Sequence, residues 1–272
     1  MNEKVCKRYI NLNFYFRKML RKLYDSRMIV AGLMSGTGSN LRMIIEHERR
    51  LDAEGGSPYH VGIIFTENPK SSAKDMGAEF NIPVYIGDMA EFYRQSGKPR
   101  KDMDVRREFD EWTAKILKEH GVNAIAYAGY MSIATEPLVN AALGINVHPA
   151  DLSITKPDGM RKYTGAYAVR DAILGGEKEL RSTTHLVESE VDAGKIFMIS
   201  PPLKVILPGD WDPKDAEQVK QVSNEHQERL KRFGDWVIFP KTLEDIARGR
   251  FETGMNGTLH FDGKSIPNGL RL

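Results

Sequence analysis

A chain of 272 residues is long enough for one large domain, or for one domain with appended ends. Its 41% hydrophobic and 28% charged residues are typical of a globular protein, and no apolar run approaches the roughly 20 residues that would cross a bilayer. The single cysteine, Cys6, excludes a disulfide framework and a cysteine-based zinc site, so we expect a reducing, cytoplasmic setting.

The net charge of +2 is unevenly distributed along the chain. Residues 1–27 hold eight Lys and Arg against Glu3 and Asp25, a balance of +6, which leaves −4 for the remainder. A net negative body is not expected to bind nucleic acid. The basic segment also carries apolar residues, so it is either an amphipathic helix on a membrane or partner surface, or a simple extension of the body. We favour the extension and expect no membrane contact.

A strand, a glycine-rich turn and a helix are predicted at the start of the body. The apolar run of residues 28–34 predicts a buried strand, the turn covers residues 35–40, and a helix begins at Leu41. Free N–H groups and the helix dipole make such a turn a site for an anion, although a plain tight turn has the same appearance. Leu41 stands where the third glycine of a dinucleotide fingerprint would be, so no dinucleotide site is expected.

Strands and helices then alternate, which predicts an α/β fold with a doubly wound, mostly parallel sheet. The expected strands cover residues 59–65, 83–86 and 122–128, and the expected helices cover residues 71–80 and 105–120. The polar segment 89–104 is predicted to be a surface loop or a partly ordered lid. Ligands bind such sheets beyond the carboxyl ends of the strands.

The pattern changes after residue 150, so the body is divided into residues 28–150 and a C-terminal part of residues 151–272. Strands that alternate in polarity predict antiparallel pairing in this part. The expected helices cover residues 165–174, 214–233 and 242–248, the expected strands residues 182–187 and 195–206, and the expected hairpin residues 258–266.

Asn146 and His148 end a short apolar run and lie two residues apart, so on a strand they project from the same face. An amide donor beside an imidazole suits a site where charge develops on a carbonyl oxygen. The alternative is a polar strand end that caps the turn into Pro149.

Ordered motifs make the chain resemble the phosphoribosylglycinamide formyltransferase family, as a divergent member. In order, the motifs are S-G-x-G-S-N-L from Ser35, A-G-Y-M from Ala128, N-x-H-P from Asn146, K-Y-x-G from Lys162, T-x-H-x-V from Thr183, V-D-x-G from Val191, N-E-H from Asn224 and F-D-G-K from Phe261. The resemblance implies a Rossmann-like formyltransferase fold. It also implies transfer of a formyl group from 10-formyltetrahydrofolate, as co-substrate, to the amine of glycinamide ribonucleotide in purine biosynthesis, or to a related phosphorylated amine.

By the same resemblance, the catalytic residues are Asn146, His148 and Asp192. Asn146 would donate a hydrogen bond to the oxyanion, and His148 would stabilise it and relay a proton. Asp192 would orient the imidazole and raise its pKa. No metal is required by this chemistry.

The resemblance also implies two sets of binding residues. The substrate phosphate would be bound by Gly36, Thr37, Gly38, Ser39 and Asn40, and the substrate by Glu225 as well. The folate would be bound by Arg106, Tyr130, Met131, Ser132, Ile133, Glu188 and Val191. An ordinary ion pair for Arg106 and plain surface charge for Glu225 are the alternatives.

Several departures from the family pattern surround the predicted substrate sites. Ser132 replaces an arginine, Tyr167 replaces a histidine, Val222 stands where a polar contact is common, and extra residues surround 157–159. We therefore expect the chemistry to be kept while the acceptor or the folate contacts differ.

Two other functions stay open: a deformylase that hydrolyses formyltetrahydrofolate, or a non-catalytic binding relative. The glycine-rich turn argues against hydrolysis, because water needs no phosphate anchor. The expected partners are a folate and a phosphorylated amine, bound by a monomer or homodimer.

Overall fold

A computed structural model of the chain describes residues 27–254 and 257–272, so nearly all of the basic extension predicted for residues 1–27 lies outside the described residues. The helices are α2 (Ser39–Ala53), α3 (Ala73–Phe80), α4 (Met89–Ser96), α5 (Met103–Glu119), α6 (Glu136–Val139), α7 (Ala168–Leu174), α8 (Ala216–Leu230), the π-helix η1 (Lys231–Asp235) and α9 (Trp236–Ala247). The strands are β1 (Met28–Leu33), β2 (Tyr59–Thr66), β3 (Val84–Ile86), β4 (Ala124–Tyr127), β5 (Leu143–His148), β6 (Glu179–Leu180), β7 (Thr183–Leu186), β8 (Ile196–Ile199), β9 (Leu203–Lys204), β10 (Phe251–Thr253), β11 (Leu259–Phe261), β12 (Lys264–Ser265) and β13 (Leu270–Arg271). None of the helices in this part of the chain is long and apolar enough to cross a membrane.

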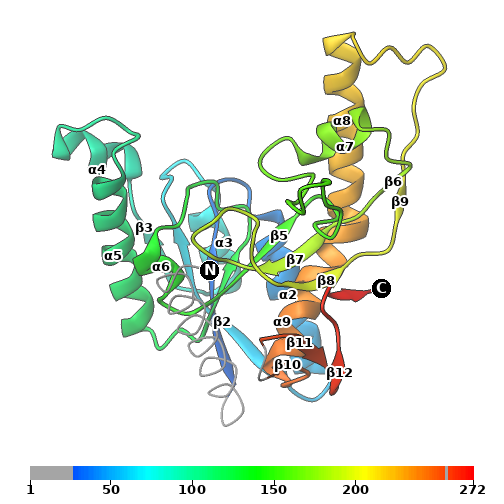
Figure 1. Cartoon of the computed structure of the whole chain (residues 1–272). Helices are drawn as coiled ribbons and strands as arrows, with labels where there is room; N and C mark the ends of the chain where they lie inside the picture. The colour runs from blue at the N-terminus through cyan, green and yellow to red at the C-terminus, as the bar shows by residue number, and fades with distance from the viewer. Residues whose placement is uncertain (1–26, 255–256) are drawn as a thin grey trace, which may run out of the picture.

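An eight-stranded sheet forms the centre of the molecule, in the order β13-β8-β7-β5-β4-β1-β2-β3 (Figure 1). The strands from β3 to β5 pair in parallel, whereas β7 runs antiparallel to both β5 and β8. The predicted α/β class, with a mostly parallel sheet and antiparallel strands near the C-terminus, is confirmed. The order of the strands reverses at β1, which pairs with β2 on one side and with β4 on the other.

Helices cover both faces of this sheet. Neighbouring residues of β1 point to opposite faces, so each face of the strand packs against different helices. Val30 packs in a cluster with α2 and α9, while Ala31 packs in a second cluster with Phe109 of α5. Both β1 residues and Phe109 are almost fully buried. Complete burial of a side chain such as Phe109 stabilises the fold by about 1.5–3 kcal/mol.

The segment 89–104 is not the loop that the sequence predicts. It holds α4 and the start of α5, which stand beyond the β3 edge of the sheet (Figure 1). The side chain of Asp88 accepts a hydrogen bond from the first turn of α4, Asp102 caps α5 in the same way, and Gly97 ends α4 at φ 67°. The loop prediction rested on polar composition and is wrong, because two capping aspartates and a glycine favour helices in this segment.

The C-terminal part also differs in detail from the prediction. The strand expected over residues 195–206 is split into β8 and β9, which lie in different sheets, because Pro201 and Pro202 interrupt the ladder. The helix expected over residues 214–233 is α8 followed by the π-helix η1, and α9 begins at Trp236 although Pro240 lies inside it. The predicted hairpin near residues 258–266 is present as β11 and β12.

Close packing of α3 on the sheet leads to a stability prediction. A Cβ atom on Gly77 would lie 2.1 Å from Val84 Cγ2 and 2.8 Å from the Ile82 carbonyl oxygen. We expect Gly77→Ala to lower the free energy of unfolding by about 1–3 kcal/mol, although alanine favours a helix by about 1 kcal/mol. Urea denaturation measures this change.

The neighbouring, exposed Ala78 provides the control, because Ala78→Gly changes only the helix propensity. That variant should lose about 1 kcal/mol. A Gly77→Ala protein more stable than the wild type would show that α3 does not need this close approach.

Candidate active site

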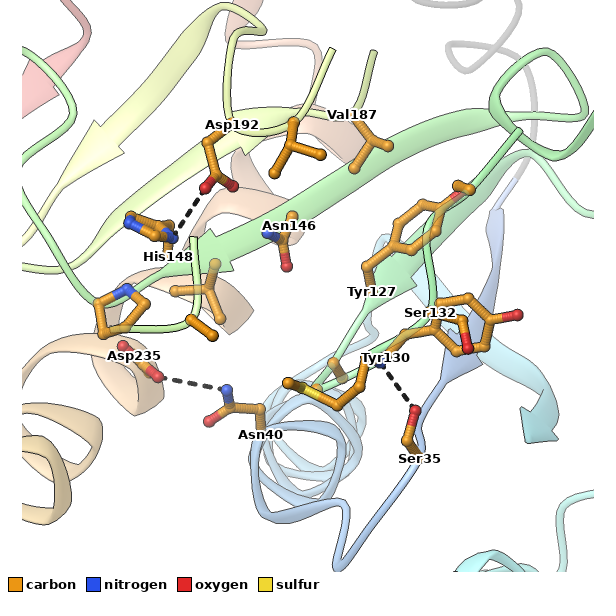
Figure 2. Close-up of a pocket in the computed structure, with 18 of the residues that line it drawn as sticks. Ser35, Asn40, Tyr127, Tyr130, Ser132, Asn146, His148, Val187, Asp192 and Asp235 are labelled. Carbon is orange, nitrogen blue, oxygen red and sulfur yellow. Dashed lines mark hydrogen bonds and ion pairs between the residues drawn. The ribbon is translucent and has the colours of Figure 1, made fainter. Parts of the chain in front are cut away.

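A cavity of about 610 Å³ opens at the carboxyl edge of the sheet, beside the point where the strand order reverses (Figure 2). This is the place where doubly wound sheets bind ligands, because the loops on either side of the reversal diverge. The loop after β1, the segment after β4, the end of β5 and the turn after β7 all contribute to its lining. These four segments therefore meet around one cavity.

The structure brings Asn146, His148 and Asp192 together in this cavity. Asn146 pairs in register with His185 of β7, and its Nδ2 lies 3.2 Å from His185 Nε2. Asp192 Oδ2 lies 3.5 Å from His148 Nδ1, and its Oδ1 lies 3.5 Å from His185 Nε2. Figure 2 shows the carboxylate of Asp192 pointing toward His148. One carboxylate thus faces two imidazoles, of which only His148 was predicted to be catalytic.

Burial and local charge set the protonation of this group. Burial disfavours the charged form of Asp192, but hydrogen bonding by His185, the charge of His148 and the Gly165 N–H lower its pKa to about 2. Burial lowers the pKa of His148 and outweighs the opposite effect of Asp192. Asp192 therefore raises the pKa of His148, as predicted, but burial makes the net change a decrease.

A backbone contact selects the basic nitrogen of His148. Its Nε2 lies 2.9 Å from the carbonyl oxygen of Tyr163, so in the neutral ring this nitrogen carries the hydrogen and donates it. The lone pair is then on Nδ1, which faces the ionised Asp192. A proton that arrives at Nδ1 would be stabilised by that carboxylate.

The glycine-rich loop supplies the positive end of a helix to the same cavity. Gly36 to Asn40 line it, and Gly38 has φ 69° just before α2. A Cβ atom on Gly38 would lie 2.7 Å from the side-chain ends of Met34 and Met76, and its positive φ is one that residues with a Cβ atom rarely adopt, so glycine is favoured here. The first turn of α2 contains no acidic residue and no side-chain cap, so its N–H groups remain suited to an anion.

An apolar wall lies on the other side of the cavity. Met131 and Ile133 follow β4 and Val191 lies in the turn after β7, with exposed fractions of 74%, 55% and 58%. Exposed apolar side chains around a cavity are typical of a surface that binds a planar, partly apolar ligand. Tyr130, Ser132 and Glu188, which are predicted to bind the folate, also line the cavity.

Two predicted binding residues do not line the cavity. Arg106 is 4% exposed and is held by Asp110 at 2.7 Å and by the Tyr130 hydroxyl at 3.0 Å. Its guanidinium supports the segment after β4 from behind and is not presented to a ligand. Glu225 is exposed on α8, where Gln221 donates a hydrogen bond to it.

Sequence analysis missed a carboxylate that does line the cavity, Asp235 of η1. It accepts a hydrogen bond from Asn40 Nδ2 at 3.3 Å (Figure 2) and another from the Ser182 hydroxyl. Burial raises its pKa to about 6, against the effect of these hydrogen bonds. The sequence signal for Asp235 was an aspartate inside the apolar stretch before Pro240. The prediction instead followed the N-E-H motif at residues 224–226 and chose Glu225.

Comparison with known proteins gives a consistent family. Residues 28–226 match the family model described as formyl transferase. The chain is 27% identical to a phosphoribosylglycinamide formyltransferase of Haemophilus influenzae over 241 residues, which cover 88% of this chain and 95% of that protein. It is 29% identical over 231 residues to the trifunctional purine biosynthetic protein adenosine-3 of Drosophila melanogaster, covering 84% of this chain. The match spans only 14% of that much longer protein.

Solved structures share the fold. A phosphoribosylglycinamide formyltransferase from Coxiella burnetii superposes with a TM-score of 0.67 at 22% identity, covering 91% of this chain and 100% of that one. A glycinamide ribonucleotide transformylase from Symbiobacterium toebii gives a TM-score of 0.65 at 21% identity, covering 86% of this chain and 93% of that one.

The buried Asp235 leads to a prediction on stability and pH. A carboxyl whose pKa is raised in the folded state binds its proton more tightly there, so stability falls as pH rises from about 4 to about 6 and stays reduced above that. We expect Asp235→Asn to raise the free energy of unfolding by about 1–3 kcal/mol at pH 8, with the gain vanishing near pH 4. Urea denaturation at both pH values measures this.

Asp245 is the matched control, because it is equally buried but paired with Lys241 at 3.0 Å and with Arg250 at 2.9 Å. Asp245→Asn should destabilise the protein at pH 8, since it leaves two cations without their partner. If Asp235→Asn destabilises the protein to the same extent at pH 8, the unfavourable charge inferred for Asp235 is wrong.

Proposed function

Since this chain belongs to the formyl transferase family, we propose that it transfers a formyl group from 10-formyltetrahydrofolate to the amine of a phosphorylated acceptor. Glycinamide ribonucleotide is the acceptor that the names of the relatives indicate. One observation carries the proposal: the glycine-rich helix end and the group formed by Asn146, His148 and Asp192 line a single cavity.

The side of the cavity at α2 fits a phosphorylated acceptor. The N–H groups of the loop would bind the phosphate, and Lys231 lines the cavity from η1 with a cation now paired with Glu228 at 2.6 Å. Asn40 Oδ1 is buried without a hydrogen-bond partner among the described residues. This oxygen would accept a hydrogen bond from an acceptor hydroxyl, beside the carboxylate of Asp235.

The opposite side fits the donor. Met131, Ile133 and Val191 would pack against the faces of the pterin ring, whose burial removes apolar surface from water. Ser132, at the position of the family arginine, instead donates a hydrogen bond to Glu67 at 3.1 Å. The donor would therefore be bound here mainly by packing and backbone contacts.

The chemistry requires one proton to move between two nitrogens. The acceptor amine attacks the formyl carbon, and the carbonyl oxygen becomes an oxyanion to which Asn146 Nδ2 donates a hydrogen bond. His148 Nδ1 takes the proton from the attacking nitrogen, and Asp192 stabilises the resulting imidazolium. The same proton then passes to N10 of the folate as the bond from carbon to N10 breaks. Amine and formyl donor become formamide and tetrahydrofolate, with no net change in charge.

Hydrolysis of the donor is the competing function, and it would use the same three residues with water in place of the amine. The loop before α2 favours transfer, because a water molecule gains nothing from an anion site. The two functions differ in whether formate appears without an acceptor.

A transfer assay tests the proposal. With 10-formyltetrahydrofolate and glycinamide ribonucleotide, we expect one formylated amine for each donor consumed. An acceptor without its phosphate should show a KM at least about 100-fold higher, because it loses several charge-assisted hydrogen bonds. Formate release at the same rate with no amine present would establish hydrolysis instead, and no donor consumption with any amine would refute both.

Substitution of the proposed catalytic residues gives a second prediction. His148→Ala and Asp192→Asn should each lower kcat by about 100-fold or more, as expected for an acid–base group and its charged partner. His60 is the control histidine, since it is half exposed, paired with Glu48, and located at the opposite end of the sheet on β2. His60→Gln should keep kcat, and a wild-type rate in either site variant would remove that residue from the mechanism.

A further inference from the structure

A small hairpin, residues 154–162, follows the end of β5 and stands beside the cavity. Thr155 and Arg161 form an antiparallel bridge, and the N–H of Lys156 donates to the carbonyl of Met160 at 2.8 Å. These residues include positions 157–159, around which the sequence is expected to depart from the family pattern. The hairpin places Arg161 at its inner end.

The base of the hairpin is tied to the central sheet. Arg271 of β13 forms an ion pair with Asp151 at 3.0 Å and donates to the Ser153 hydroxyl at 2.6 Å. The hydroxyl of Thr183 in β7 donates to the carbonyl of Ala150 at 2.6 Å. Two strands, β7 and β13, therefore fix the residues just before the hairpin, and this fixes the position of the base of the hairpin.

The guanidinium of Arg161, in this hairpin, contacts the turn that carries Asp192. One of its terminal nitrogens donates to the carbonyl of Asp192, and the other donates to the carbonyl of Gly194 at 2.6 Å. On the far side the turn packs directly on β7, because a Cβ atom on Gly194 would lie 1.8 Å from the Leu186 carbonyl oxygen. The turn is thus held between the sheet and the arginine.

The backbone conformation of Asp192 explains why the two hydrogen bonds from Arg161 would help to hold this turn. Its φ of 55° lies in the left-handed region, which residues with a Cβ atom adopt uncommonly, although aspartate does so more readily than most. Its carboxylate accepts a hydrogen bond from the Gly165 N–H at 2.8 Å and faces His148 and His185 at the same time. A small rotation of the turn would move both carboxylate oxygens away from both rings.

We propose that Arg161 is a positioning residue for formyl transfer, which holds the backbone of Asp192 so that its carboxylate faces His148. The inference rests on the proposed function. It requires the forked guanidinium, because two carbonyl oxygens two residues apart are bound by two different nitrogens of one planar group. A lysine in the same place keeps the charge but offers a single ammonium.

Arg161→Ala tests this positioning role in the full-length protein. We expect kcat to fall by about 10- to 100-fold, as misplacement of a catalytic group by about 1 Å does, while the KM of the acceptor stays within about twofold because the loop before α2 is untouched. Added guanidinium ion should restore part of kcat by filling the space between the two carbonyls. Arg161→Lys should give an intermediate kcat.

Arg181 is the control, since one of its nitrogens donates to the carbonyl of Ser200 at 2.9 Å away from the cavity. Arg181→Ala should keep kcat and show no response to guanidinium. An Arg161→Ala enzyme with wild-type kcat, or with a loss that neither guanidinium nor lysine relieves, overturns the inference. A wild-type protein that transfers no formyl group overturns the proposed function itself, and the inference with it.

Discussion

The candidate active site depends on keeping the buried carboxylate of Asp192 ionised. Taking a carboxylate out of water without partners costs several kcal/mol, so its charge survives only because specific donors and cations surround it. Hydrogen bonding from His185 and the Gly165 N–H, with the charge that His148 carries once it is protonated, lowers its pKa to about 2 despite burial. Each of these partners comes from a different segment, so the ionised state requires β5, β7 and the loop before α7 to be in place at once.

The same burial has the opposite effect on the imidazole. Burial favours the neutral form of His148, and its Nδ1, which faces Asp192, keeps the lone pair because Nε2 donates to Tyr163. A neutral base beside a fixed negative charge is prepared to accept a proton, whereas a permanently protonated ring would not be. Asp192 therefore acts mainly after the proton has arrived, when the imidazolium needs a counter-charge in a poorly solvated place.

The sequence predicted the fold and the shared face of Asn146 and His148, because both follow from local rules. Period two along β5 placed Asn146 and His148 on one face, and the alternation of strands and helices brought the loops after β1 and β4 to one edge. The outer residues could not be placed in this way. Arg106 and Glu225 were chosen from short helical motifs, and a helical motif does not reveal which face of the helix meets the cavity. Asp235 was missed because a π-helix shifts the register of facing residues by about one per turn.

The segments where the sequence is expected to depart from the family pattern lie at the periphery of this arrangement, and the structure shows the contacts of two of them. Ser132 contacts Glu67, which also accepts from Ser35, so the segment after β4 is tied to the glycine-rich loop through one carboxylate. The hairpin of residues 154–162 contacts the turn after β7 through Arg161, and β13 holds Asp151 just before the hairpin. Both segments are therefore held by contacts inside the protein. Contacts within the protein thus hold the reacting groups of the site in place. Less of the binding energy of the acceptor and donor is then needed to order these groups.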